Sequence, residues 1–424
     1  AKVVYELAGR TDVGTDGGPS GASDVVTLTI EPGVVVFASA GNAFLVVNRG
    51  NSINAAGTTA NPIVFTSDEN LRGSTTDNTD RQWGGVILLG RAPIADCEDD
   101  GATGGTAACE AQIEGTPLAA LYGGATANDD SGTMRNVQIR FSGFPLAPDN
   151  ELQSLTTGGI GSGTTLENIM SFNSSDDGAE FFGGVVNMRN FIAVGAGDDS
   201  IDLDSGVQFN LQNTIVVQRT STGNSILEID SSGGADDLPR TDVRISNGTF
   251  VAQSSASDDA AFRFRSGGAD IALANIVMDA QNYNQPCIDI EGDAVLQTSG
   301  PEEMGIPFFA SVYLDCGSAG IYNADRAAAA EAAFNATSNN TFNSATPSDD
   351  DFDVNLQMVY VNDSTLNGLT AFDPGQFNSN GFTFQNLGYV GAANGTTTWF
   401  QGWSCDSGWA DFNGSGNCAD SPVG

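Results

Sequence analysis

The sequence predicts an all-β chain wound into a right-handed parallel β-helix, a solenoid in which each coil is one lap of the chain. A phrase of an apolar residue, any residue and an asparagine recurs along the middle of the chain, ending at Asn136, Asn168, Asn190, Asn213, Asn247 and Asn275. The steps between these asparagines run from 22 to 34 residues, as expected when coils have a minimum length and loops bulge outward. The short β-branched runs also follow one another too closely for helices to lie between them. Parallel strands connected in this way form right-handed crossovers, which makes the coil right-handed.

The N-terminal part of the chain carries consecutive strand signals. Short β-branched runs at 25–30, 34–37, 44–47 and 62–66 are broken by glycine, proline and asparagine, which is typical of short strands separated by turns. The apolar run at 83–90 contains glycines that let a neighbouring backbone approach closely. We therefore expect the coils to begin near the N-terminus.

The coils are clearest between residues 134 and 290. Segments such as 176–184 and 198–206 alternate apolar and polar residues and end in glycine, which indicates strands with one face in a core. If the recurring asparagines occupy one corner of every coil, their side chains stack. Such a ladder satisfies amides that would be costly to bury alone.

One helix interrupts the strand pattern. Residues 324–334 are rich in alanine, and Asn323 precedes them as a candidate N-cap. The helix falls in 317–352, which we interpret as an outward excursion, and 92–133 is interpreted as a second insertion. Loops on a rigid scaffold usually carry function, so these two insertions are where we expect partner contacts.

The predicted organisation is a single β-helix domain over residues 1–400, followed by a C-terminal tail, 401–424. The tail region holds three of the four tryptophans, namely Trp399, Trp403 and Trp409. An aromatic, cross-linked segment suits a cap, because an open solenoid end exposes both core and strand edge. Stacking of these tryptophans on a glycan is the alternative use.

The six cysteines fall into three local pairs, Cys97 with Cys109, Cys287 with Cys316, and Cys405 with Cys418. Their even number and short separations predict three disulfides, each in a loop outside the repeat. The alternative is six buried free thiols. Disulfides together with strong acidity favour a location outside the cytoplasm.

Composition excludes several classes of function. Asp and Glu number 53 against 15 Lys and Arg, the net charge is −38, and histidine is absent. That charge disfavours nucleic acid and anionic membranes as partners. Without histidine, Ser-His-Asp and Cys-His catalysis and histidine-ligated zinc or iron are excluded. No apolar stretch of about 18 residues occurs, so we expect no transmembrane segment, and no signal peptide is visible, as in a processed mature chain.

Several phrases carry a resemblance to a known group of proteins. They lie at 28–33, 57–67, 83–94, 159–164, 176–184 and 399–403. On these phrases, which are spread over most of the chain, the protein resembles a large group of uncharacterised secreted or surface-attached right-handed β-helix proteins of Gram-negative bacteria. The resemblance implies the fold and an exported location, and it offers no catalytic residues to carry over.

The acidic pairs Asp176-Asp177 and Asp198-Asp199 are 22 residues apart, so they should stack in adjacent coils at about 4.8 Å. Two bare carboxylates at that distance repel by roughly 3–4 kcal/mol at an effective dielectric constant of about 20. A bound calcium ion would remove this repulsion, because calcium accepts oxygen ligands alone. Further oxygen ligands could come from Glu180, Asp202 and Asp204. The alternative is a set of exposed turns that fan apart and attract only diffuse counterions.

The same carboxylates could serve catalysis, since paired acids cleave polysaccharides by hydrolysis and calcium with a basic residue supports elimination. The basic candidates are Arg189, Arg263 and Arg265. No motif places an acid and a base next to each other, however, and arginine is a poor base because its pKa is very high.

Two hypotheses of function follow. The first is a non-enzymatic extracellular or cell-surface β-helix, stabilised by calcium if the acidic pairs bind it, and used in assembly as a filament or surface-layer subunit, an adhesin or a partner of an outer-membrane receptor. Head-to-tail self-association is its specific form, because such contacts repeat when their rotation does not close a ring. The second is a polysaccharide-active enzyme or a glycan-binding module that uses the acidic face around 176–204.

Overall fold

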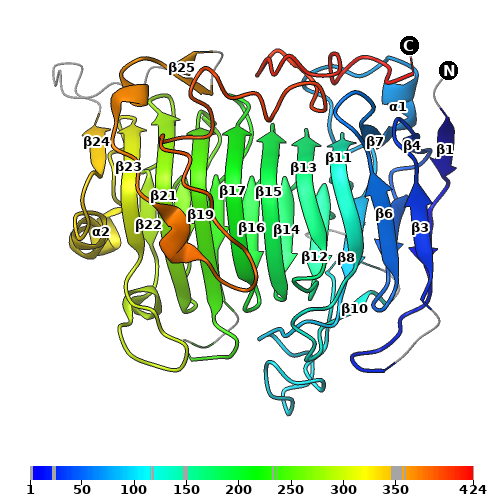
Figure 1. The fold of residues 1–424 in the computed structure, drawn as a ribbon, viewed down its shortest axis with the longest axis horizontal. Coiled ribbons are helices and arrows are strands. Elements are labelled where there is room, and N and C mark those ends of the chain that lie inside the picture. The colour runs from blue at the N-terminus through cyan, green and yellow to red at the C-terminus, as the bar shows by residue number, and fades with distance from the viewer. Residues whose placement is uncertain are drawn as a thin grey trace.

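The computed structural model describes residues 3–21, 25–114, 116, 119–146, 151–231, 234, 236–344, 356–357 and 360–423. These residues form a parallel β-helix whose strands lie side by side along one long axis (Figure 1), which confirms the predicted fold class. Two parallel sheets build it, called here the long sheet and the short sheet.

The long sheet has 13 strands within the described residues. Its main path is β1 (Val4–Leu7), β4 (Val35–Ala38), β7 (Ile63–Ser67), β11 (Gly132–Arg140), β13 (Thr165–Phe172), β15 (Val185–Val194), β17 (Gln208–Val217), β19 (Thr241–Val251), β21 (Ala269–Ala280), β23 (Phe308–Cys316) and β24 (Thr341–Ser344). Beside this path lie β3 (Thr27–Ile30) and β6 (Ser52–Ala56). Strand β11 pairs with β6 through its first half and with β7 through its second half, so each later long strand spans two faces of the coil.

The bend between these two halves is the corner that the asparagine phrase predicts. Asn136, Asn168, Asn190 and Asn213 have φ between 50° and 67°, the left-handed region that asparagine tolerates better than most residues. Each side-chain amide donates to the Oδ1 of the preceding rung at 2.7–2.8 Å, from Asn168 to Asn136 and onward to Asn213. The predicted asparagine ladder is therefore present over four of the six asparagines, and Asn136 ends it by donating to the carbonyl of Gly57 at 3.0 Å. Asn247 and Asn275 have the same positive φ but donate to carbonyls of residues 389 and 372 instead.

The short sheet has nine strands within the described residues. In order they are β2 (Arg10–Val13), β5 (Phe44–Val47), β8 (Gly85–Leu89), β12 (Leu155–Gly158), β14 (Ala179–Phe182), β16 (Ile201–Asp204), β18 (Leu227–Ile229), β20 (Phe262–Phe264) and β22 (Ile288–Ile290). Glu180 pairs with Asp202 and Phe181 with Leu203, so one lap at this point is 22 residues, as the sequence spacing predicts.

The interior of the coils is a continuous apolar core. Inward-facing residues such as Leu45, Leu88, Phe181 and Leu203 are at most 1 % exposed and belong to one cluster that extends along both sheets. Alternation of inward apolar and outward polar residues along each strand produces this arrangement.

The insertion expected at 92–133 lies on the outer face of the short sheet. Its hairpin of β9 (Ala111–Gln112) and β10 (Leu121–Tyr122) is antiparallel. Ile94 and Tyr122 of this segment bury the outward side chains Phe44 and Ile87 in a second, smaller core. Burial of these outward apolar residues explains why this part of the segment packs on the sheet, while other loops of the insertion extend beyond the strands (Figure 1). The expected end at residue 133 is slightly late, because β11 begins at Gly132.

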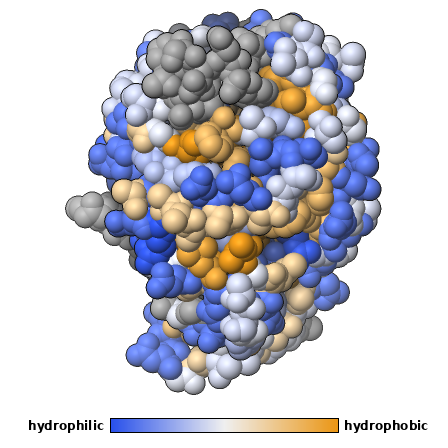
Figure 2. Space-filling model, turned by 90° about the vertical axis from the view of Figure 1, so that its left-hand side faces the viewer, coloured by the Kyte–Doolittle hydropathy of each residue, from blue (hydrophilic) through white to orange (hydrophobic). Residues whose placement is uncertain are grey.

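The predicted helix closes the core at the end opposite β1. Asn323 accepts a hydrogen bond from the backbone of Asp325 at the start of the 3-10 turn η2 (Ala324–Arg326), and α2 (Ala327–Phe334) follows. Phe334 packs on Phe309 with ring centroids 5.4 Å apart. Figure 2 views this end, where hydrophobic residues lie among hydrophilic ones. The described part of the excursion expected at 317–352 thus belongs to the last coil, since β24 pairs with β23; residues 345–352 lie outside the described residues.

The C-terminal segment is not the end cap that the sequence predicts. Residues 360–423, called here the return segment, run back along the outside of the long sheet toward the N-terminal coils (Figure 1). Asn275 donates to the carbonyl of Phe372, whereas Asn70, near the other end, donates to the carbonyl of Cys418. The predicted boundary at residue 400 is therefore too late. The chain has left the coils by residue 360, since side chains along the outside of the β-helix bind the backbone of the residues that follow.

The return segment is short of regular structure. It contains β26 (Val361–Asn362), paired with β25 (Leu356–Gln357), and the 3-10 turns η3 (Leu366–Gly368) and η4 (Pro374–Phe377). The remaining short elements are α1 (Asp68–Leu71) and the 3-10 turn η1 (Asp293–Leu296). Among the described residues, no helix is a candidate for spanning a membrane.

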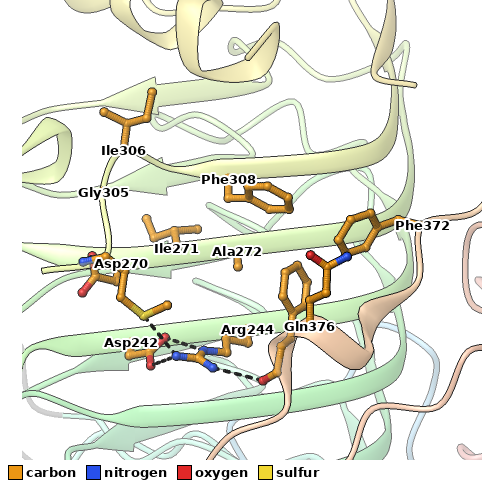
Figure 3. Close-up of a pocket in the computed structure, with 12 residues that line it drawn as sticks. Asp242, Arg244, Asp270, Ile271, Ala272, Gly305, Ile306, Phe308, Phe372 and Gln376 are labelled. Carbon is orange, nitrogen blue, oxygen red and sulfur yellow. Dashed lines mark hydrogen bonds and ion pairs between the residues drawn. The ribbon is translucent and has the colours of Figure 1, made fainter. Parts of the chain in front are cut away.

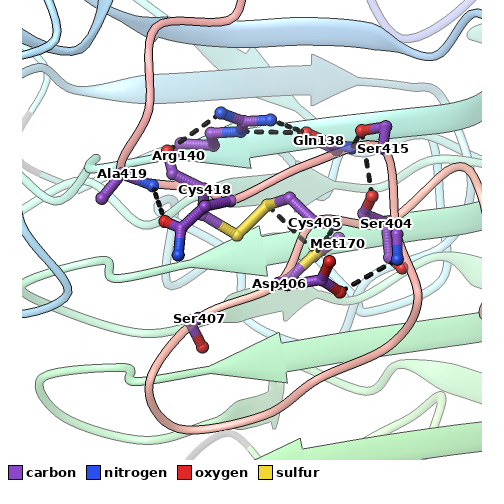
Figure 4. Close-up of a disulfide and its surroundings, with 12 residues drawn as sticks. Gln138, Arg140, Met170, Ser404, Cys405, Asp406, Ser407, Ser415, Cys418 and Ala419 are labelled. Atoms are coloured by element: carbon purple, nitrogen blue, oxygen red, sulfur yellow. Dashed lines mark hydrogen bonds between the residues drawn. A yellow bond between two sulfur atoms is a disulfide. The ribbon is translucent and has the colours of Figure 1, made fainter.

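The three disulfides join the cysteines as predicted. Cys97–Cys109 lies in the insertion, and Cys405–Cys418 lies in the return segment against Met170 of β13 (Figure 4). The expected position outside the repeat is wrong for Cys287–Cys316, because both sulfurs lie in the main core cluster, where Cys316 ends β23. This bond links two consecutive coils.

Candidate cation site on the short sheet

The outward side chains of the short sheet change character from strand to strand. They are apolar in β5 and β8, where Phe44 and Ile87 lie under the insertion. Strand β12 places Thr156 beside Ile87, and the coils after it place acidic side chains in line with Thr156, with Glu180 in β14, Asp202 in β16 and Glu228 in β18. We use the name acid row for these strand carboxylates together with those of the preceding turns. Its members are Asp176, Asp177, Glu180, Asp198, Asp199, Asp202, Asp204 and Glu228.

Backbone hydrogen bonds between coils fix the turn carboxylates. The amide of Asp199 donates to Asp177 Oδ1 at 2.9 Å, and the amide of Ser225 donates to Asp199 Oδ1 in the following coil. Each aspartate is therefore stacked on the next, as the 22-residue spacing predicts. In each case, Oδ2 remains available for another ligand.

The stacking brings the carboxylates into three overlapping groups, in which oxygens from all three residues lie within 4.8 Å of one another. The groups are Asp176–Asp177–Asp198, Asp177–Glu180–Asp202 and Asp199–Asp202–Glu228. Calcium binds oxygens at about 2.3–2.6 Å, so ligands on opposite sides of one ion are about 4.8 Å apart. Six of the seven predicted ligands take part; Asp204 does not, since its carboxylate bonds to the amide of Ser205.

The central group is deeply buried and incompletely bonded. Glu180 and Asp177 are each 6 % exposed. Glu180 Oε2 and Asp202 Oδ1 are buried and have no hydrogen-bond partner among the described residues. A buried carboxylate oxygen without a donor is costly, so this group needs protons or a cation.

Burial raises the pKa of all three carboxyls in the central group, Asp177, Glu180 and Asp202. For Glu180 and Asp177 the pKa lies well above its usual range, first because of burial and then because of neighbouring carboxylates. Burial, with Asp198 close by, raises the pKa of Asp176 to about 7. Burial also raises the pKa of Asp204 to about 6. The row therefore favours neutralisation over bare charge.

Arginines neutralise only one end of the row. Arg263 Nη1 lies 2.7 Å from Glu228 Oε2, and Arg265 Nη1 lies 2.7 Å from Glu228 Oε1. No ion pair joins an arginine to Glu180 or Asp202 within the described part of the chain. The group Asp177–Glu180–Asp202 therefore depends on protons or a bound cation for its neutralisation.

Sequence reasoning missed three acids near the row. Glu228 follows Asp202 by 26 residues, and one more lap of the coil spacing could have found it. Glu114 comes from the insertion and Glu151 from the segment before β12; burial raises the pKa of Glu114, and Glu151 raises it further. No local signal in the sequence places either acid beside Asp176.

Of the candidate arginines, Arg263 and Arg265 contact the acid row at Glu228, whereas Arg189 and the three candidate tryptophans lie elsewhere. Arg189 is on the long sheet, over the ring of Phe382 at 4.2 Å. Trp403 is 1 % exposed in the cluster under the return segment, and Trp399 and Trp409 pack against that cluster. The indole of Trp403 donates to the carbonyl of Trp399 at 2.6 Å. This placement favours a packing role for these tryptophans over glycan stacking.

Comparison with known proteins adds a family to this geometry. A family model described as a pectate-lyase-like beta helix domain matches residues 4–404. The match begins at β1 and extends through all the coils into the return segment. No curated protein and no solved structure matches the chain.

Proposed function

The chain belongs to the family of pectate-lyase-like β-helix domains, and from this premise and the geometry of the acid row we propose that it is an extracellular structural protein. In this proposal the β-helix is a rigid, non-enzymatic scaffold used in assembly. The acid row holds a divalent cation, calcium by preference, that stabilises neighbouring coils.

The observation that carries the proposal is the burial of the acid row. A catalytic carboxylate must reach the bond it cleaves, whereas Glu180, Asp199 and Glu228 are only 5–6 % exposed. A cation that is coordinated between coils needs no such access. Asp177, Glu180 and Asp202 would supply the ligands, from two successive coils.

An extracellular location agrees with the covalent structure. Three disulfides cross-link the insertion, the last coils and the return segment, and disulfides persist in oxidising compartments. Calcium is also available in such compartments to a site built from oxygen ligands.

The first coil supports a role in assembly. Within the described residues, β1, β2 and β3 each pair on one side only, and unpaired edges are templates for another chain. Apolar side chains on this coil are exposed, including Tyr5 at 60 % and Val25 at 67 %. At the other end of the long sheet, β24 pairs only with β23 among the described strands. We propose that copies associate head to tail through these ends, an arrangement that extends into a filament unless its rotation closes a ring.

We expect the purified protein to form end-to-end oligomers whose population rises with concentration. The double variant Tyr5→Asp/Val25→Asp should remain monomeric in analytical ultracentrifugation and as dispersed particles in electron microscopy, because charges on an apolar edge oppose contact. Met304→Asp, which changes an exposed apolar side chain (65 %) near Arg244 of β19 and away from the first coil, should assemble like the wild type. A wild type that stays monomeric at all calcium concentrations would contradict head-to-tail association.

A second candidate function is cleavage of a polysaccharide. The family description refers to a lyase that acts on pectate, and one end of the acid row is open. Asp198 is exposed there, Asp176 is half-buried, and burial raises the pKa of Asp176 to about 7, which suits a general acid near neutral pH.

Incubation with acidic and neutral polysaccharides, with and without calcium, separates the two functions. The structural proposal predicts no new reducing ends and no absorbance from unsaturated uronates. Activity that is lost in Asp176→Asn and Asp198→Asn, with folding unchanged by circular dichroism, would establish the enzymatic function instead.

A further inference from the structure

A cavity of about 220 Å³ lies on the outside of the long sheet, away from the acid row. Its floor comes from β19, β21 and β23, one wall from the return segment at η4, and the other wall from residues 304–306 (Figure 3). Neither the proposed cation site nor the proposed assembly contacts use this cavity.

The hollow arises from one small residue in a column of larger ones. Strand pairing aligns Arg244, Ala272 and Phe308 in three successive coils. Ala272 leaves space between the guanidinium on one side and the aromatic ring on the other (Figure 3). Phe372 and Phe377 of the return segment stand against Phe308, each with ring centroids 5.7 Å from it. The cavity thus has an aromatic side that is rigidly held.

Polar groups occupy the opposite side and the rim. Arg244 binds both oxygens of Asp242, at 2.9 and 2.7 Å, and donates to the carbonyl of Phe377 at 3.1 Å. Asp270 accepts from the amide of Met304 at 3.0 Å and is paired with Arg240, whose Nε lies 3.3 Å from Oδ2. The exposed Gln376 also lines the space. These groups offer acceptors and an amide donor to hydroxyl groups beside an apolar face.

The mouth of the cavity exposes large apolar side chains. Met304 is 65 % exposed and Ile306 is 36 % exposed, two of the few large apolar residues on the described surface that are so accessible. A ligand that covers them would remove this surface from water.

We propose that this cavity binds one ring of a neutral sugar. A pyranose presents an apolar face to Phe308 and Phe372 and hydroxyl groups to Asp242, Asp270 and Gln376. The volume is below the roughly 300–1,000 Å³ typical of sites for drug-sized ligands, so one ring fits and a longer chain would extend outside. Asp242 is paired with Arg244 and Asp270 with Arg240, so the net charge of −38 is what opposes uronates and phosphates.

Saturation-transfer NMR with methyl glycosides of glucose, galactose, mannose and fucose, and with methyl glucuronate, tests this site. At least one neutral glycoside should bind with millimolar affinity, and the glucuronate should not. Ala272→Leu, which fills the hollow from an outward position, should abolish the signal. Gln376→Ala, which changes an exposed side chain and leaves the fold intact, should weaken binding several-fold.

Ala328→Leu, the same substitution at an exposed position of α2, is the matched control and should bind like the wild type. Absence of binding by every neutral glycoside would overturn the proposal. So would binding that persists unchanged in folded Ala272→Leu, or stronger binding of the glucuronate than of any neutral glycoside.

Discussion

We expect removal of divalent cations to lower the stability of the protein at neutral pH, and the double variant Glu180→Gln/Asp202→Asn to lose this dependence. A cation that binds only the folded chain stabilises it by about 2.7 kcal/mol when its free concentration is 100 times its dissociation constant. In the wild type without cations, the carboxylates of Asp177, Glu180 and Asp202 are left buried and unpaired. In the double variant two charges are gone, so the metal-free protein is more stable than the metal-free wild type.

Thermal unfolding with calcium and with a chelator measures this effect. Glu331→Gln/Asp258→Asn removes two exposed carboxylates outside the row and should retain the wild-type response to chelator. A wild type whose melting temperature is the same in calcium and in chelator would show that the row is not a structural cation site.

In chelator the pH dependence has a definite sign. Carboxyls whose pKa is raised on folding bind more protons in the folded state, so stability falls as pH rises. For Asp204 and Asp176 the fall begins above their unfolded pKa, near 3.9, and is complete beyond a folded pKa of about 6 and about 7, respectively. For each pH unit by which the folded pKa exceeds the unfolded pKa, a carboxyl changes the free energy of unfolding by about 1.4 kcal/mol across this pH range. Saturating calcium should reduce the change of melting temperature between pH 5 and pH 8 and leave the part that comes from Asp204, which belongs to none of the cation groups.

Interruption of the asparagine ladder has the second large effect. Asn190 has a φ of 60°, donates to Asn168 Oδ1 at 2.7 Å and accepts from Asn213 Nδ2 at 2.8 Å. Asn190→Ala loses both hydrogen bonds, at about 1 kcal/mol each, and places an alanine in the left-handed region at a cost of about 1–2 kcal/mol. We expect a loss of about 3–4 kcal/mol in chemical denaturation.

Asn190→Gly separates the two causes. Glycine adopts positive φ without strain, so this variant should lose only about 2 kcal/mol. Asn335→Ala, at an exposed position after α2 with ordinary backbone geometry, should change stability by less than about 0.5 kcal/mol. Equal losses in the glycine and alanine variants would mean that the backbone conformation does not contribute.

Local sequence pattern predicts the coils well because each coil repeats the same physical requirements. The asparagine phrase locates the corner, and the 22-residue lap places Asp177 beneath Asp199. The course of the return segment could not be predicted, because its contacts join residues hundreds of positions apart. Gln138, for example, donates to Ser415 at 3.0 Å and Arg140 to the carbonyl of Cys418 at 2.9 Å (Figure 4).

The sequence identifies seven residues of the acid row, all but Glu228, but not their surroundings. Equal spacing identifies stacked aspartates, whereas burial depends on the insertion that covers the sheet. The neutralisation of Glu228 by Arg263 depends on a lap of 35 residues, which only the strand register reveals. No sequence motif predicts the sugar cavity either. It forms because Ala272 lies between the larger residues Arg244 and Phe308 of the adjoining coils.

A crystal structure of the protein grown with calcium, with anomalous scattering used to identify the ion, tests the central claim most directly. The account predicts an ion coordinated by Asp177, Glu180 and Asp202, at about 2.3–2.6 Å from their oxygens, which is absent from crystals of Glu180→Gln/Asp202→Asn. Crystals that bind calcium elsewhere and leave this group without an ion would contradict it.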